Sequence, residues 1–173
     1  MTAEATGPSR KILVGFGLVL VAGAALTLLV PSRLLEGGTP APAFELERLA
    51  DGRQVSLAEL QGKVVVDFWS STCPPCIRQM RDLESLHVSY HERDVVVLGI
   101  NTEGSPPAFL RDFLQQRGGV HYDVLINGAA VSEAYQVDAL PTLYVIDQQG
   151  TIRWSRVGYT PLREIEDTVA ELL

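Results

Sequence analysis

The chain contains two cysteines, Cys73 and Cys76, within the segment WSSTCPPC at residues 69–76. Residues 64–69 form an apolar run typical of a buried strand, and residues 77–90 have amphipathic helical spacing. The pair is therefore expected where a strand passes into the N-terminus of a helix. Unpaired backbone N–H groups and the helix dipole favour the thiolate there, which is the reactive form of cysteine. Two thiols one turn apart can close and reopen a disulfide, so the pattern predicts a dithiol–disulfide exchange centre.

Two other uses of a cysteine pair fit the sequence less well. A closed zinc site needs four Cys or His ligands, but there is no second cysteine pair, and His87, His91 and His121 show no ligand spacing near Cys76. The two helical histidines four residues apart are expected to be a solvated pair. A purely structural disulfide usually closes a longer loop, since the stabilisation grows with loop length. We expect no metal and no cofactor.

Residues 12–30, ILVGFGLVLVAGAALTLLV, contain no charge over 19 positions. A helix of that length spans about 28 Å, close to the thickness of the bilayer core. Arg10 and Lys11 precede the run, so the positive-inside rule places the N-terminus in the cytoplasm and the cysteines outside it. The segment is predicted to be a single transmembrane anchor that contacts the lipid bilayer.

A cleaved signal peptide is the alternative interpretation of this segment. Its apolar core is normally 7–15 residues long, and the small residues at positions 22–25 lie inside the run rather than after it. Both interpretations put the cysteines in an extracytoplasmic space, on the periplasmic side of the cell membrane, where disulfides persist. The expected organisation is a cytoplasmic tail (1–11), an anchor (12–30), a linker (31–43) and one domain (44–173).

The charge of the chain lies in the predicted domain. Residues 1–43 hold three basic and two acidic groups, whereas residues 44–173 hold 11 basic and 19 acidic groups. An acidic surface disfavours nucleic acid and anionic lipid headgroups as partners, so no nucleic acid is expected to bind.

The elements that position the cysteines follow from hydrophobic periodicity and turn residues. We expect a β-hairpin at 43–49 and 53–57, a helical turn at 56–60, strands at 64–69, 94–101, 120–126, 143–147 and 152–157, and helices at 74–90, 106–117, 129–135 and 162–173. This alternation predicts a mixed α/β sheet covered on both faces. About 130 residues can bury an adequate core without further cross-links.

At this point the chain resembles the thioredoxin superfamily. The segments VDFW (66–69) and CPPC (73–76) resemble the family's active-site strand and helix, and ALPT (139–142) resembles its second signature. In that family the signature proline follows a cis peptide bond and lies against the cysteines, which implies a cis bond between Leu140 and Pro141.

The subgroup that the chain most resembles is the membrane-anchored TlpA/ResA group. The shared features are the anchor, the leading hairpin, the Trp-x-x-x-Cys-x-x-Cys form and the extra helix and strand within 106–126. The resemblance covers residues 41–173. It implies a thioredoxin-like fold with an N-terminal β-hairpin and an inserted helix and strand, preceded by one transmembrane helix. It also implies extracytoplasmic reduction of protein disulfides, in cytochrome c maturation or metal-centre assembly, with a membrane thiol-transfer protein as electron donor.

Roles for individual residues follow from the motif and the resemblance. Cys73 is the expected nucleophile and Cys76 the resolving thiol, with a Cys73–Cys76 disulfide in the oxidised form. Asp67 is a charged residue in an apolar strand and matches the buried aspartate of thioredoxin that relays a proton; the alternative is a strand-end carboxylate that reaches water. Pro141 completes the predicted site. The residues expected to contact substrate are Trp69, Pro74, Pro75, Leu140 and Thr142.

Two local differences qualify the resemblance, and the two prolines bear on the working direction. Many members of the subgroup carry glutamate three residues after the second cysteine, where this chain has Gln79, which cannot exchange a proton near neutral pH. One maturation branch has a Gly-Val-x-Gly-x-Pro-Glu pattern, which is absent at 136–142. Pro74 and Pro75 lack N–H donors that could stabilise a Cys73 thiolate, which favours a reductant over a strong oxidant.

Two rival functions remain open on the sequence. A thiol peroxidase of this fold normally has Pro-x-x-x-Thr-x-x-Cys, but Val66 and Ser70 stand at the proline and threonine positions. A copper-handling module could use Cys73 and Cys76 as soft ligands, ordinarily with a Met or His nearby.

Overall fold

The computed structural model describes residues 34–60 and 62–172. Its strands are β1 (Glu45–Glu47), β2 (Gln54–Ser56), β3 (Lys63–Trp69), β4 (Val95–Asn101), β5 (Asp123–Leu125), β6 (Thr142–Ile146) and β7 (Ile152–Val157). Its α-helices are α1 (Pro74–Tyr90), α2 (Pro107–Gln115), α3 (Ala129–Ala134) and α4 (Leu162–Ala170), and the 3-10 helices are η1 (Leu57–Glu59) and η2 (His91–Arg93). The predicted mixed α/β architecture is confirmed.

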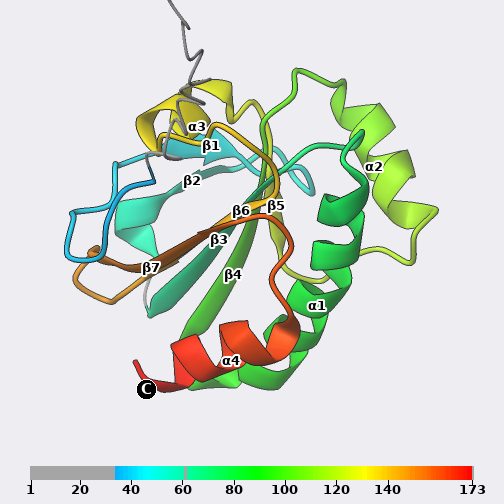
Figure 1. Ribbon diagram of the computed structural model, residues 1–173. Coiled ribbons are helices and arrows are strands. Elements are labelled where there is room, and N and C mark those ends of the chain that lie inside the picture. Colours follow the sequence, from blue (N-terminus) through cyan, green and yellow to red (C-terminus); the bar gives the residue numbers. More distant parts are fainter. Residues whose placement is uncertain (1–33, 61, 173) are drawn as a thin grey trace, which may run out of the picture.

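A five-stranded sheet in the order β5-β4-β3-β6-β7 forms the centre of the domain (Figure 1). The β3 strand is parallel to β4, which is parallel to β5, whereas β6 is antiparallel to both β3 and β7. The central strand β3 is buried along nearly its whole length, as its apolar sequence predicts. The loops that follow the parallel strands β3 and β4 leave the same end of the sheet, and Cys73 lies where the first of them enters α1, which contains Cys76.

Side chains alternate between the two faces of β3 and pack into two separate hydrophobic cores. Val65 and Trp69 point to the face covered by α1 and α4, where they pack with Leu83 and Ile165 among others. Val64, Val66 and Phe68 point to the opposite face, where Phe68 packs with aromatic and aliphatic side chains from the hairpin, α3 and β6. Because the alternation is strict, Asp67 must face the same side as Val65 and Trp69.

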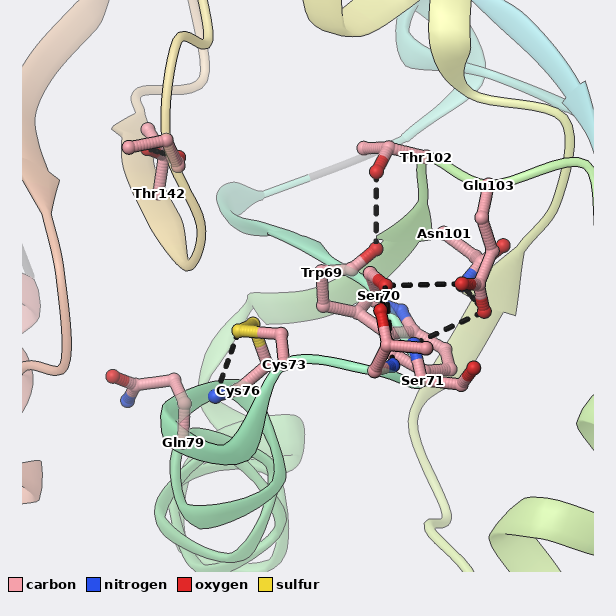
Figure 2. Close-up of a disulfide and its surroundings, with 12 residues drawn as sticks. Trp69, Ser70, Ser71, Cys73, Cys76, Gln79, Asn101, Thr102, Glu103 and Thr142 are labelled. Atoms are coloured by element: carbon pink, nitrogen blue, oxygen red, sulfur yellow. Dashed lines mark hydrogen bonds between the residues drawn. A yellow bond between two sulfur atoms is a disulfide. The ribbon is translucent and has the colours of Figure 1, made fainter.

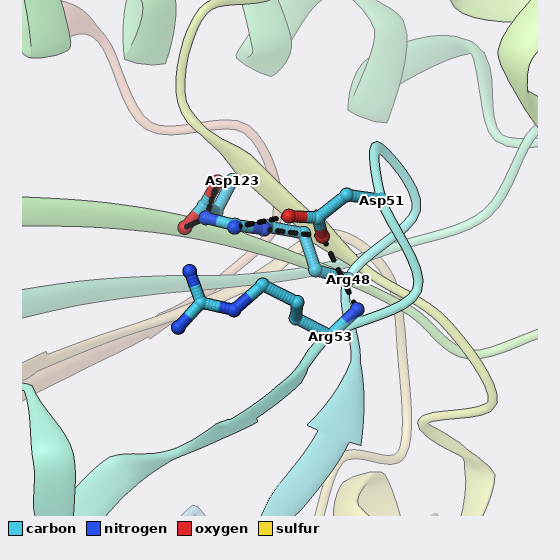
Figure 3. Close-up of polar contacts among 4 residues, drawn as sticks. All are labelled: Arg48, Asp51, Arg53 and Asp123. Carbon is cyan, nitrogen blue, oxygen red and sulfur yellow. Dashed lines mark hydrogen bonds and ion pairs between the residues drawn. The ribbon is translucent and has the colours of Figure 1, made fainter.

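The β1–β2 hairpin is fastened to the edge of the main sheet (Figure 3). The backbone of Arg48 forms an isolated antiparallel β-bridge with Leu125 of β5. The Arg48 guanidinium donates hydrogen bonds to the carboxylates of Asp51 and Asp123. The Arg53 N–H also donates to Asp51 at 3.2 Å, which closes the hairpin turn. The hydrogen bonds from Arg48 lower the pKa of Asp51 to about 2.

Residues 34–42 lie against the edge strand β7. The Gly38 N–H donates to Ile152 O at 2.8 Å, and the Ile152 N–H donates to Thr39 O at 2.9 Å. This stretch belongs to the segment 31–43 that the sequence assigns to a linker. It packs on the domain because an edge strand offers unpaired backbone groups that any extended segment can bind.

The predicted tail (1–11) and anchor (12–30) lie outside the described residues. In the part of the chain that the structure does describe, no helix combines the length and the apolar character needed to cross a bilayer.

Candidate active site

Cys73 and Cys76 form a disulfide at the N-terminus of α1, with an S–S distance of 2.02 Å (Figure 2). Cys73 is half-buried, whereas Cys76 is 0% exposed. Pro74 and Pro75 form the first helical turn and are exposed. The more accessible sulfur therefore belongs to the first cysteine, as expected for a nucleophile, and the enclosed sulfur to the second.

The helix terminus supplies an N–H group to the Cys73 sulfur. Cys73 is the N-cap residue of α1, and its Sγ accepts a hydrogen bond from the Cys76 N–H at 3.3 Å. Pro74 and Pro75 have no N–H, so the Cys76 amide is the first donor along the helix. When the disulfide opens, this donor and the helix dipole stabilise a thiolate on Cys73.

The Leu140–Pro141 peptide bond is cis, as the resemblance implies. Pairing of Phe68 with Thr142 in antiparallel register places Pro141 beside the end of β3, where the chain turns toward Cys73. Pro141 itself is buried, and the half-buried Leu140 packs against the same core cluster as Cys73.

Two of the predicted substrate contacts are enclosed in this disulfide form. Trp69 is 0% exposed and stacks on Phe113 with ring centroids 6.1 Å apart. Thr142 is also 0% exposed, and its Oγ1 donates a hydrogen bond to Ala139 O at 2.7 Å. Neither side chain can touch a substrate here, because both are packed inside the domain although they lie close to the motif in the sequence. Trp69 is a wall of the site rather than a contact surface.

Asp67 is fully buried beneath the site. Its side chain is 0% exposed, and neither carboxylate oxygen accepts a hydrogen bond from any described residue. Burial raises the pKa of Asp67 well above its ordinary value. The alternative of a strand-end carboxylate that reaches water is therefore wrong. Because Asp67 shares a face of β3 with Trp69, which packs in one cluster with Cys76, the carboxyl lies on the cysteine side of the sheet.

The residues beside Asp67 offer it no hydrogen bond in the described part of the chain. Gly99 pairs with it on β4, and a Cβ at Gly99 would lie 3.2 Å from both Trp69 Nε1 and Tyr122 Cε2. The glycine thus makes room for two aromatic rings. Burial, and next the charge of Asp67, raise the pKa of Tyr122. The Trp69 Nε1 is also buried without a partner among the described residues. The environment favours a neutral, protonated Asp67.

Gln79 has a structural role that the sequence did not reveal. Its Nε2 donates to Thr160 O at 3.0 Å, and its Oε1 accepts from the Thr160 N–H at 2.8 Å. The loop containing Thr160 is in turn bonded to the cis-proline segment, because the Gly158 N–H donates to Pro141 O at 2.7 Å. An amide can donate and accept at once, whereas an ionised carboxylate cannot. Glutamine therefore suits this position in this chain.

Glu103 is a residue of the site that the sequence did not single out. It binds the loop that precedes Cys73 (Figure 2). Its only sequence signal is its place after a predicted strand that ends at the same sheet edge as the cysteine loop.

Comparisons with known proteins agree with this geometry. Residues 38–155 match the model of the AhpC/TSA family. A thiol-disulfide oxidoreductase ResA from Halalkalibacterium halodurans is 36% identical over 121 residues, which cover 69% of this chain and 67% of that protein. A thioredoxin-like protein YneN from Bacillus subtilis is 29% identical over 134 residues, covering 76% of this chain and 78% of the other.

Solved structures show the same fold. A thioredoxin-family thiol:disulfide interchange protein from Chlorobium tepidum superposes with a TM-score of 0.69 at 23% identity, over 80% of this chain and 97% of that one. A DsbF homologue from Corynebacterium diphtheriae gives a TM-score of 0.70 at 22% identity, over 80% and 91%. With its Cys-x-x-Cys disulfide at a helix N-terminus beside a cis-proline, the chain belongs to the AhpC/TSA family and is a thioredoxin-like thiol:disulfide oxidoreductase.

Proposed function

We propose that the enzyme reduces protein disulfides outside the cytoplasm and is held at the membrane by residues 12–30. The disulfide chemistry is supported by one observation: a half-buried Cys73 is paired with a fully buried Cys76 at one helix terminus. The apolar run and its flanking basic residues support the location. The resemblance to the TlpA/ResA group supports substrates in cytochrome c maturation or metal-centre assembly.

The reaction proceeds by two thiol–disulfide exchanges. The Cys73 thiolate attacks one sulfur of a substrate disulfide, forms a mixed disulfide and releases the other substrate sulfur as a thiolate. The Cys76 thiolate then attacks Cys73 Sγ and releases the second substrate thiolate. Two electrons pass to the substrate, and the enzyme is left with the Cys73–Cys76 disulfide. A membrane dithiol donor restores the dithiol by the reverse exchanges.

Asp67 serves the second exchange. Cys76 is buried, so its thiol needs a nearby base before it can attack. A carboxyl whose pKa is raised by burial is a stronger base than an exposed aspartate, so it can take up or give back a proton as Cys76 changes state. Leu140 is half-buried and packs against the same core cluster as Cys73, so its exposed part offers a surface for an extended substrate segment.

Trapping the mixed disulfide tests the proposal. The full chain carrying Cys76→Ser should accumulate disulfide-linked adducts with extracytoplasmic proteins, because Cys73 can attack but nothing resolves the product. Cys73→Ser is the matched control and should trap none. Adducts only with cytoplasmic proteins, or equal adducts in both variants, would overturn the proposal, and rapid peroxide turnover would favour the peroxidase alternative instead.

Whether the enzyme reduces or oxidises its substrates can be tested by measuring its reduction potential. Among residues 34–60 and 62–172, a single N–H, that of Cys76, donates to Cys73 Sγ. With so few donors to stabilise a thiolate, the reduced form gains little stability and the enzyme should be a good electron donor. Equilibration with thiol–disulfide buffers should give a reduction potential near or below that of thioredoxin, about −270 mV. A potential close to that of DsbA, about −120 mV, would indicate an oxidase.

A further inference from the structure

In the loop between β3 and Cys73, the backbone N–H groups of Ser71, Thr72 and Cys73 all donate hydrogen bonds. The Thr72 N–H donates to Ser70 Oγ at 3.2 Å, and the Cys73 N–H donates to Ser70 O at 3.2 Å. These two bonds stay within the loop. The third donor, the Ser71 N–H, donates to Glu103 Oε1 at 3.0 Å, so its acceptor belongs to a separate loop.

Glu103 fastens the cysteine loop to the neighbouring strand end (Figure 2). Its Oε2 accepts from Ser70 Oγ at 2.9 Å, while its Oε1 accepts from the Ser71 N–H and, at 3.3 Å, from Asn101 Nδ2. Asn101 is 0% exposed and pairs with Trp69 across the sheet. We call Glu103 with these three donor residues the Glu103 bridge. It ties the loop before the nucleophile to the rigid end of β4.

The bridge is charged across the physiological range. Partial burial raises the pKa of Glu103, but the hydrogen bonds from Ser71, Ser70 and Asn101 together outweigh that effect and lower it below its ordinary value. A lowered pKa means that the carboxylate persists at neutral pH and is lost only in acid. Hydrogen bonds to a charged acceptor are stronger than neutral ones, so the bridge fixes the loop firmly.

We propose that Glu103 is a positioning residue that holds the Ser70–Thr72 loop so that the Cys73 sulfur stays at the N-terminus of α1. The hydrogen bond from the Cys76 N–H to Cys73 Sγ, at 3.3 Å, depends on the backbone path into Cys73. A released loop lets the sulfur leave the helix terminus, and the thiolate loses its donor. The inference deepens the proposed function and rests on Cys73 being the exchange nucleophile.

A positioning role and a purely electrostatic role of Glu103 predict opposite effects on how readily the Cys73 thiolate forms, so the two can be told apart. If Glu103 acted only through its negative charge, removing that charge would make the Cys73 thiolate easier to form. If Glu103 acts by holding the loop, removing it makes the thiolate harder to form. Glu103→Gln separates the two, because its amide can still accept from the Ser71 N–H and donate to Ser70 Oγ while carrying no charge.

The experiment measures the alkylation rate of Cys73 against pH in the reduced full chain, in detergent, with Cys76→Ser as background. Glu103→Ala should raise the pH midpoint by about 0.5 to 1 unit, which slows alkylation at pH 7 about three- to tenfold. Glu103→Gln should restore most of the rate. Ser70→Ala should give an intermediate shift, and should add little to Glu103→Ala because both remove the same bridge. Glu133→Ala removes an exposed carboxylate on α3 and serves as control.

Three results would overturn the proposal. The midpoint could fall equally in Glu103→Ala and Glu103→Gln, which indicates a charge effect. It could stay unchanged in Glu103→Ala and Ser70→Ala alike, which indicates no effect on the thiolate. If Glu103→Ala did not fold, an unchanged pH midpoint in Ser70→Ala would by itself overturn the proposal. Alkylation needs no protein substrate, so this assay can succeed even if the trapping experiment for the proposed function fails.

Discussion

At the scale of single residues, Asp67 is the most costly feature of the site. A buried carboxyl with no hydrogen-bond partner among the described residues loses its hydration without compensation. The fold nevertheless keeps it on the cysteine side of β3, opposite a glycine that admits the rings of Trp69 and Tyr122. Such a cost is typical of groups retained for acid–base chemistry.

We expect Asp67→Asn to slow the release of reduced substrate while sparing the first attack by Cys73. Asparagine is nearly isosteric but cannot take up the Cys76 proton, so the second exchange should fall about ten- to a hundredfold near pH 7. Stopped-flow measurement of mixed-disulfide decay between pH 6 and 9 checks this. Decay that matches the wild-type chain at every pH would refute the role, and an unaltered alkylation rate of Cys73 is the control.

The same substitution should stabilise the protein at neutral and alkaline pH. Because burial raises the pKa of Asp67 in the folded state, the folded state holds a proton that the unfolded state releases above about pH 4. The wild-type chain therefore loses stability as pH rises from there toward the raised pKa, and Asp67→Asn escapes that loss. Thermal melts at pH 4 and pH 8 should show a larger advantage for the variant at pH 8. An equal difference at both would contradict this assignment.

At the scale of elements, most of the scaffold was predictable because it follows from local patterning. The helix Pro74–Tyr90 matches its prediction at both ends, since two prolines set its start and its apolar spacing continues to its last turn. The predicted strand at 120–126 is shorter in the structure, at Asp123–Leu125, because only these three residues pair with β4. The 3-10 helix His91–Arg93 was not predicted, and it ends at Asp94 in a left-handed conformation.

The supporting contacts of the site were not predictable, since they join distant segments. Gln79 and Thr160 are 81 positions apart, and Ser70 and Glu103 are 33 apart. No periodicity or motif links such residues in one sequence. The sequence thus identified the thiols and Asp67, whereas the groups that hold their surroundings emerged only once the strands were in register.

The pairing of α1 with the loop before α4 can be tested at Gln79. Gln79→Ala leaves the Thr160 N–H and C=O without partners and should cost about 2 to 4 kcal/mol of folding free energy. Gln79→Glu keeps both bonds only when protonated, so its folded-state pKa should be raised. Its stability should therefore approach that of the wild-type chain near pH 4 and fall as pH rises. Chemical denaturation at several pH values measures both effects.

The outcome that would contradict this interpretation is a pH-independent stability in Gln79→Glu. The exposed Gln149 on the β6–β7 turn offers a matched control, because Gln149→Glu adds the same charge away from Thr160. We do not expect Gln79→Glu to restore the exchange rate lost in Asp67→Asn, since the side chain at position 79 is hydrogen-bonded to the backbone of Thr160.

At the scale of the whole molecule, the segment 34–42 extends the domain beyond the predicted boundary at residue 44. It covers part of the edge strand β7, and Leu34 and Leu35 pack against the core on the hairpin side of the sheet. The Ser155 Oγ donates to Leu35 O at 3.2 Å, which adds a contact from β7 itself. The sequence did not predict this packing because a segment rich in glycine and proline has no strand pattern of its own.

Two truncated chains test how much this segment contributes. A chain that begins at residue 34 should keep the stability of the domain, whereas a chain that begins at residue 43 should lose about 3 kcal/mol or more. The estimate comes from three backbone hydrogen bonds, from Gly38 to Ile152, from Ile152 to Thr39 and from Ala41 to Gly150, at about 1 kcal/mol each. Burial of the two leucines adds to it. Since domains are stable by only about 5 to 15 kcal/mol, the shorter chain should melt markedly lower and exchange its β7 amide protons faster. Equal melting temperatures for the two chains would show that residues 34–42 only rest on the sheet, and that the stable domain begins at residue 43 or later.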